Sequence, residues 1–73
     1  MIEIGKIIEE KLAEEDRKPG WLARQMGRSR SYVERLLEKS TIDIGDLIII
    51  SKVLKFNFFT YYYTDIEEHL SQK

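Results

Sequence analysis

A break near the middle of the chain constrains the fold more than any other feature. Gly27 comes directly after the apolar positions Leu22, Ala23 and Met26, where a residue in the left-handed conformation would end a helix. Ser29 follows two residues later and is a favoured N-cap residue for another helix. The sequence therefore predicts two helices joined by a connection of only about three residues.

Helices joined by so short a Gly-containing turn cannot lie antiparallel along their length, and they cross at roughly 90 to 120°. The helix before the turn is predicted over residues 19–25, because proline is acceptable at the first helical position. The helix after the turn is predicted over residues 30–39, with Val33, Leu36 and Leu37 facing inward at helical spacing. This geometry is that of a helix-turn-helix.

Three further helices are predicted from the hydrophobic pattern. Residues 3–16 form an amphipathic helix, and residues 44–54 are apolar almost all round the helix axis, which predicts a buried helix. Residues 58–68 form a last, aromatic-rich helix. Strand remains an alternative for 44–54 and for 56–64, because β-branched and aromatic residues favour sheets. The predicted fold is an all-α, compact five-helix bundle containing the helix-turn-helix.

Length and composition limit the classes of function. A chain of 73 residues makes a single domain, 1–73, and a deep substrate pocket would remove core that so small a domain cannot spare. The absence of cysteine excludes disulfides and thiolate metal sites, and His69 has no second histidine at ligand spacing. No catalytic residue, metal or cofactor is therefore predicted. We expect a cytoplasmic protein, since the sequence contains neither a signal peptide nor a membrane-spanning run.

The charges are segregated along the chain, although the total is only −1. Residues 1–16 carry two basic and six acidic side chains, a net charge of −4. Residues 17–39 carry seven basic and two acidic side chains, a net charge of +5, and residues 40–73 return to −2. This segregation predicts one basic face on an otherwise acidic body. The alternative is ordinary surface charge that the fold disperses.

Residues 22–36, with the sequence LARQMGRSRSYVERL, resemble the Cro and lambda-repressor-like helix-turn-helix family, of the type that includes xenobiotic-response-element regulators. Residues 44–59 look like the fourth helix of that family and its exit, so the resemblance covers residues 4–60. It implies a cytoplasmic transcriptional regulator that binds double-stranded operator DNA as a homodimer, with its third helix in the major groove. The family often has glutamine where this chain has Pro19.

The resemblance also implies which residues contact DNA. The base-reading positions of the family fall on Arg30, Ser31, Glu34 and Arg35. Candidates for contacts with the DNA backbone are Lys18, Arg24, Arg28, Ser29, Tyr32 and Lys39. An arginine can make a bidentate contact with guanine, and a glutamate can accept a hydrogen bond from cytosine. The alternative is that Arg30 pairs with Glu34, and Arg35 with Glu38, along the surface of the helix.

The aromatic C-terminal segment suggests self-association. Three consecutive tyrosines of a helix point in three directions, so a small bundle cannot bury all of them. Candidates for a dimer contact are Phe59, Tyr61, Tyr62 and Tyr63, and residues 61–73 form a candidate dimerisation tail. The alternative is that the tyrosines only cover the end of the core.

The sequence therefore predicts two candidate functions. The first is a non-enzymatic, sequence-specific DNA-binding regulator, a repressor, that reads the major groove with the helix over 30–39 as a homodimer. The second is a protein-interaction module on the same scaffold, such as an antitoxin or an adaptor, that grips its partner with the aromatic segment.

Overall fold

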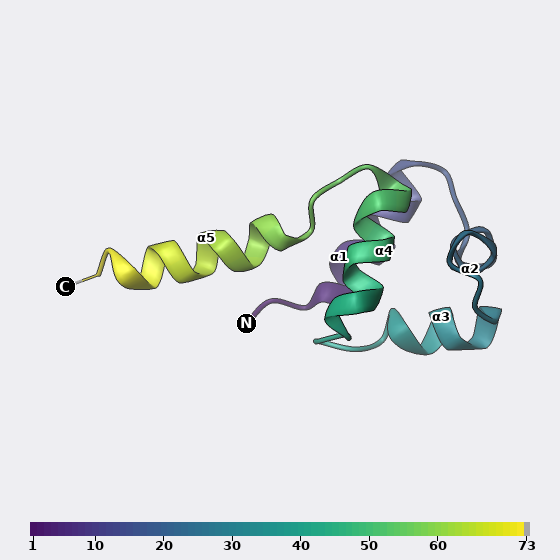
Figure 1. Cartoon of the computed structure of the whole chain (residues 1–73), viewed down its shortest axis with the longest axis horizontal. Helices are drawn as coiled ribbons and strands as arrows, with labels where there is room; N and C mark the ends of the chain where they lie inside the picture. Colours follow the sequence, from purple (N-terminus) through teal and green to yellow (C-terminus); the bar gives the residue numbers. More distant parts are fainter. Residues whose placement is uncertain (73) are drawn as a thin grey trace.

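A computed structural model describes residues 1–72, and it is entirely helical over that range (Figure 1). The helices are α1 (Ile4–Glu14), α2 (Pro19–Met26), α3 (Arg30–Leu36), α4 (Ile44–Leu54) and α5 (Phe59–Leu70). The predicted all-α class with five helices is confirmed for these residues. The strand alternatives for 44–54 and 56–64 are wrong, because both segments are helical over most of their length.

Three of the helices end at a residue with positive φ. After α1 it is Asp16 (φ 60°), after α2 it is Gly27 (φ 70°), and after α4 it is Lys55 (φ 54°). In each case an amide one residue further on bonds back across the last turn, as in a Schellman motif. The predicted left-handed Gly27 is therefore confirmed, and it is the one of the three that carries no side-chain strain.

The core is built from the inward faces of α1 to α4 together with one aromatic residue beyond α4. Helix α2 packs against both α3 and α4, and α1 lies behind α4 in the view of Figure 1. Phe58 is completely buried one residue before α5 begins. The buried apolar residues are Ile4, Ile8, Leu12, Leu22, Ala23, Val33, Leu36, Leu37, Leu47, Ile50, Leu54 and Phe58.

The start of α1 is tied to the segment that follows α3. The Ile4 N–H donates to the Ser40 carbonyl (3.1 Å), and the Gly5 N–H donates to the Lys39 carbonyl (3.0 Å). Amides at a helix start have no partner within their own helix, so these bonds satisfy groups that burial would otherwise leave unpaired. Gly5 permits the approach, since a Cβ there would lie 2.6 Å from the Lys39 carbonyl oxygen and closer still to that of Leu37.

This tie explains why α3 is shorter than predicted. The prediction of a helix over 30–39 is wrong at its end, because α3 stops at Leu36. The next amides, those of Glu38 and Lys39, bond to carbonyls three residues back and form a tightened turn. The chain leaves the helical path there so that its carbonyls can face the first amides of α1.

The prediction that α4 is buried all round is also wrong. Ile44, Ile48 and Ile49 are 65%, 41% and 40% exposed, whereas Leu47 and Ile50 on the other side are buried. The chain has too few elements to cover the outer face, because α5 projects away from the other four helices and buries none of its own residues (Figure 1). No helix within the described part of the chain is long and apolar enough to cross a membrane.

Replacing Gly5 by alanine should destabilise the fold strongly. The added methyl group meets backbone carbonyl oxygens, which cannot move as a flexible side chain can. We expect a loss of about 3 kcal/mol, seen as a fall in Tm of roughly 12–24 °C in thermal unfolding followed by circular dichroism. Gly20→Ala is the matched control. Its Cβ would meet only the Arg30 side chain at 3.9 Å, so helix propensity should make that variant slightly more stable. An unchanged Tm for Gly5→Ala would contradict the described contact.

Candidate nucleic-acid interface

The turn between α2 and α3 is held from both sides by hydrogen bonds. The Arg28 N–H donates to the Ala23 carbonyl (3.0 Å), which closes the end of α2 around Gly27. The Ser29 hydroxyl oxygen accepts from the Tyr32 N–H (3.1 Å), so the predicted N-cap of α3 is confirmed. Figure 1 looks almost along the axis of α2 while α3 lies across the view, so the two helices cross steeply.

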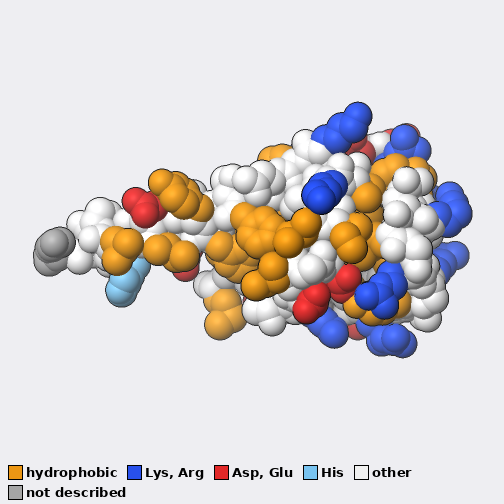
Figure 2. Space-filling model, in the orientation of Figure 1, with side chains coloured by type: hydrophobic (Ala, Val, Ile, Leu, Met, Phe, Trp, Pro, Cys, Tyr) orange, Lys and Arg blue, Asp and Glu red, His pale blue; other side chains and the backbone are white. Residues whose placement is uncertain are grey.

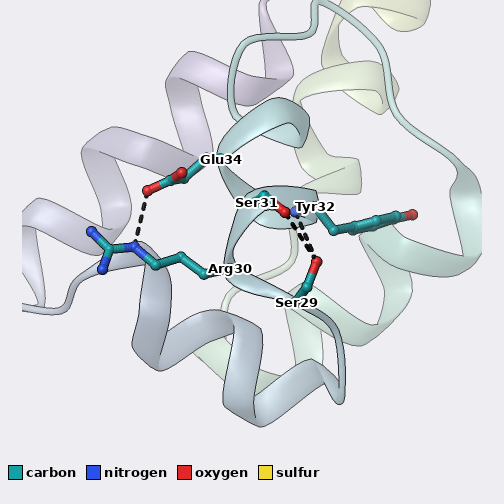
Figure 3. Close-up of polar contacts among 5 residues, drawn as sticks. All are labelled: Ser29, Arg30, Ser31, Tyr32 and Glu34. Carbon is teal, nitrogen blue, oxygen red and sulfur yellow. Dashed lines mark hydrogen bonds and ion pairs between the residues drawn. The ribbon is translucent and has the colours of Figure 1, made fainter.

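One face of α3 is presented to solvent. Val33 and Leu36 are buried against the rest of the molecule, whereas Ser31 and Arg35 are exposed on the outer side. The Ser31 hydroxyl lies 3.4 Å from the Ser29 hydroxyl, so the two serines form a small polar ridge at the start of the helix (Figure 3). Within residues 1–72 the Arg35 guanidinium makes no ion pair or hydrogen bond. It is available to a ligand.

Arg30 and Glu34 form an ion pair on one flank of this face. The Arg30 Nε lies 3.0 Å from a Glu34 carboxylate oxygen, and both side chains point away from Tyr32 (Figure 3). The alternative to base readout is an ion pair along the helix surface. This pair is present for Arg30 and Glu34, but over the described range it is absent for Arg35 and Glu38. The side chains are 73% and 49% exposed, and a pair so open to water contributes only about 0.3–0.5 kcal/mol.

The other flank is organised by a buried carboxylate. Asp46, in the first turn of α4, is only 4% exposed and accepts a hydrogen bond from the Tyr32 hydroxyl. The Arg28 guanidinium lies 3.8 Å from the same carboxylate and 4.5 Å from the centre of the Tyr32 ring. Asp46 thus holds together two residues that the sequence predicts as contacts with the DNA backbone. The proton of the Tyr32 hydroxyl is committed to Asp46, so Tyr32 mainly positions Arg28.

The hydrogen bond to Asp46, assisted by partial desolvation and by the negative charge of Asp46, raises the pKa of Tyr32 above its ordinary value of 10.0. An acid whose pKa is raised on folding stabilises the fold below its unfolded pKa, and this contribution is lost as pH rises through the folded pKa. The contact is therefore intact at neutral pH and fails only in strong alkali.

Four basic side chains gather around a surface hollow at the start of α2. The hollow, of about 410 Å³, is lined by Trp21, Gly20, Asp16 and the basic residues Arg17, Lys18, Arg24 and Arg30. The Arg17 guanidinium lies 4.4 Å above the Trp21 ring, which fixes its direction by a cation–π contact. Asp16 is the only acidic residue of the lining. The structure thus brings the predicted Lys18 and Arg24 together with Arg30.

The remaining predicted contacts lie around a second, smaller hollow of about 140 Å³ on the Tyr32 flank. Arg35 and Lys39 line it together with Asp43 and Asp46. The ten predicted DNA contacts thus fall on the outer face of α3, which includes Ser31 and Arg35, and on the two flanks beside it. Figure 2 shows basic side chains concentrated at the end of the molecule that α2 and α3 form. The basic stretch of the sequence therefore remains clustered on the face that Figure 2 shows.

Sequence reasoning missed three residues of this surface. Arg17 and Trp21 are four residues apart across the start of α2, and that spacing was the available signal for their stacking. Asp46 stands three residues after the N-cap Asp43, where an acidic residue is readily interpreted as part of a helix start. Its contact with Tyr32, 14 residues earlier in the chain, has no sequence signature.

No group of three or more histidine, aspartate or glutamate side chains within residues 1–72 is arranged to hold a metal ion. Comparisons with models of protein families, with curated proteins and with solved structures find no match to this chain.

Tyr32→Phe should remove the stabilisation due to the phenol and Asp46. Because the pKa of Tyr32 is raised on folding, the gap in stability between the wild type and the variant should be constant below about pH 9 and should shrink above pH 10. Urea unfolding of both proteins between pH 7 and pH 11 measures this gap. The two proteins differ only at this position, so the gap isolates the contribution of Tyr32. A gap that widens with pH would contradict the assignment.

Proposed function

We propose that the chain is a sequence-specific DNA-binding regulator, a repressor acting in the cytoplasm, whose α2 and α3 form a helix-turn-helix of the Cro and lambda-repressor-like type. The observation that carries the proposal is the outer face of α3. This face is exposed, and α3 itself crosses α2 steeply. The face contains Arg35, which is unpaired within the described residues, and basic side chains border it on both flanks. No other surface of the described chain combines an accessible helix with such a charge.

The dimensions of α3 suit a major groove. Seven residues make a helix about 10 Å long, and a helix with its side chains is about 10–12 Å wide, against about 12 Å for the groove of B-DNA. Ser31 and Arg35 point outward at i and i+4 on the face that would meet the bases. In this pose Arg35 makes a bidentate contact with guanine, and Arg30 does so after exchanging Glu34 for the base.

The two flanks are suited to the phosphates on either side of the groove. Arg17, Lys18 and Arg24 lie on one side, and Arg28 and Lys39 lie on the other. The family often has a glutamine at the start of α2, where this chain has Pro19. The neighbouring Arg17 and Lys18 supply side chains that can contact phosphate there instead. Because such contacts release counterions, log affinity should fall with log salt at about −0.9 per neutralised phosphate.

A single module covers only about 600–1,000 Å² of protein surface on DNA, which gives little specificity. We therefore propose a homodimer that reads two half-sites about 34 Å apart. Selection of bound sequences from a random pool of duplexes tests this directly, and an inverted repeat with that spacing is the expected product.

A protein-interaction module, such as an antitoxin or adaptor, is the second candidate. It is favoured by α5, which buries none of its residues and exposes Tyr63, Ile66 and Leu70. The two functions are compatible in one chain, since α5 lies at the opposite end of the molecule from α2 and α3 (Figure 1).

Arg35→Ala should weaken binding to the selected sequence by about 5–150-fold, the range for one bidentate contact with guanine. Arg30→Ala should have a smaller effect, because Arg30 must first leave Glu34. Fluorescence anisotropy with a labelled duplex at fixed salt gives both values. Lys6→Ala on α1 is the matched control for loss of one exposed charge and should change affinity less than twofold.

Two results would overturn the proposed function. One is the absence of binding to any duplex at low salt, and the other is binding that does not weaken as salt increases. Unchanged affinity in the double variant Arg30→Ala, Arg35→Ala, with folding intact, would favour the interaction module instead.

Glu34→Gln should strengthen binding to random duplex by about threefold. The substitution removes a negative charge from the face that meets DNA and releases Arg30 from its ion pair, while stability falls by no more than about 0.5 kcal/mol. Glu9→Gln, an exposed position of α1, is the control and should leave affinity unchanged. Weaker binding of Glu34→Gln to every sequence would show that the pair supports the DNA-bound state.

A further inference from the structure

The exposed large hydrophobic side chains are confined to two helices, apart from Met1. Figure 2 shows hydrophobic side chains over α4 and along α5 on the same face of the molecule. Monomeric proteins rarely leave extended apolar patches uncovered. The residues concerned are Ile44, Ile48 and Ile49 of α4 and Tyr61, Tyr63, Ile66 and Leu70 of α5.

The hydrophobic side chains of α5 form a narrow stripe. Phe59, Tyr63, Ile66 and Leu70 are spaced by four, three and four residues, which at 100° per residue places them within an arc of about 60°. Tyr63, Ile66 and Leu70 are 67%, 56% and 60% exposed. A helix of 12 residues is marginal in water without packing, so this stripe needs a partner.

The root of α5 is fixed, whereas its length is uncovered. The Phe58 N–H donates to the Ser51 hydroxyl (3.3 Å), and the Phe58 ring packs edge-on against Phe56 at 4.9 Å. Tyr62, in the second turn, still packs on the core, and this burial raises its pKa. Beyond that turn α5 extends away from the molecule at a direction set by its root (Figure 1).

The outer face of α4 has a matching size. Ile44, Ile48 and Ile49 lie along it, with the exposed Lys52 on the same side. Helix α4 has 11 residues and α5 has 12, so both are about 17 Å long. One helix can therefore cover the other over its full length.

We propose that the chain forms a two-fold dimer in which the apolar stripe of α5 packs on the outer face of α4 of a second copy, and the reverse. This inference rests on the proposed function only in that the function requires two copies. The contact itself involves neither α2 nor α3, so it is measured without DNA.

The charges favour α4 of the second copy, rather than its α5, as the contact partner of the α5 stripe. The polar side chains of α5 include Asp65, Glu67 and Glu68 and no lysine or arginine. Two α5 helices packed stripe to stripe would bring Glu67 of both chains to the border of one contact with no basic side chain of α5 to oppose it, which disfavours the pairing. Lys52 and Lys55 border the exposed face and the end of α4, so the α5–α4 arrangement instead places acidic residues beside basic ones.

The area is sufficient for a stable dimer. Roughly 100 Å² of uncovered surface for each exposed side chain of the two faces gives about 600 Å² per chain. Because both chains contribute this area, the reciprocal contact reaches about 1,200 Å² in total, the lower bound for a specific interface before polar atoms are included. A single, non-reciprocal contact would fall below it.

Ile48→Asp on α4 and Ile66→Asp on α5 should each weaken dimerisation at least tenfold in sedimentation equilibrium without DNA. Both positions are exposed, so circular dichroism should report unchanged folding. An equimolar mixture of the two variants should dimerise more tightly than either alone, because the α5 stripe of the Ile48→Asp chain meets the intact α4 of the other. Full-strength dimers of Ile48→Asp beside monomeric Ile66→Asp would overturn the proposal and indicate α5–α5 pairing.

A charge exchange provides the second test. Glu67→Lys and Lys52→Glu should each weaken the dimer several-fold, and the double variant should recover most of the loss. Glu68→Lys is the matched control, since Glu68 lies on the side of α5 opposite the stripe, and it should leave the dimer unchanged. Tighter association of Glu67→Lys would contradict the α5–α4 contact.

A wild-type chain that stays monomeric at 100 µM would overturn the proposal outright. The proposed DNA contact would still be measurable in that case, because a monomer with an intact α3 would bind random duplex at low salt with the expected salt dependence. The two failures are therefore distinguishable.

Discussion

The backbone bonds between the start of α1 and the segment after α3 are the constraint on which the rest of the structure depends. Free amides of one helix start meet free carbonyls beyond another helix end, through Ile4 and Gly5 on one side and Lys39 and Ser40 on the other. This contact ends α3 at Leu36, directs the chain into α4, and thereby places the outer face of α3 at the surface. A methyl group at Gly5 would therefore disturb the candidate site through the backbone of Leu37 and Lys39.

The candidate site depends in turn on a single buried acid. Asp46 lies in the first turn of α4, where the helix dipole favours a negative charge, and it contacts both Tyr32 and Arg28. An acidic side chain within a basic surface would ordinarily weaken attraction for a polyanion. Here the Asp46 carboxylate orients its neighbours, so that the Arg28 guanidinium is held against the Tyr32 ring. Asp46 therefore orders Tyr32 and Arg28 but lowers the net positive charge of this flank.

Local signals in the sequence predict the helices and the turn, because proline at the start of α2, Gly27 and the cap at Ser29 act within a few residues of one another. Long-range contacts account for the failures. The early end of α3 comes from a tie to α1, and the exposure of Ile48 reflects the direction of α5. The basic stretch predicts most of the candidate site. It does not predict Asp46, whose partner lies in another helix.

Phe58 is buried one residue before α5 begins, so substitutions in the core and substitutions along α5 have different effects on the molecule. Because Phe58, Phe59 and Tyr62 pack on the core at the root of α5, substitutions beyond Tyr62 leave the body of the protein intact. Substitutions along the apolar stripe of α5 can therefore change the exposed surface of this helix while the outer face of α3 stays the same.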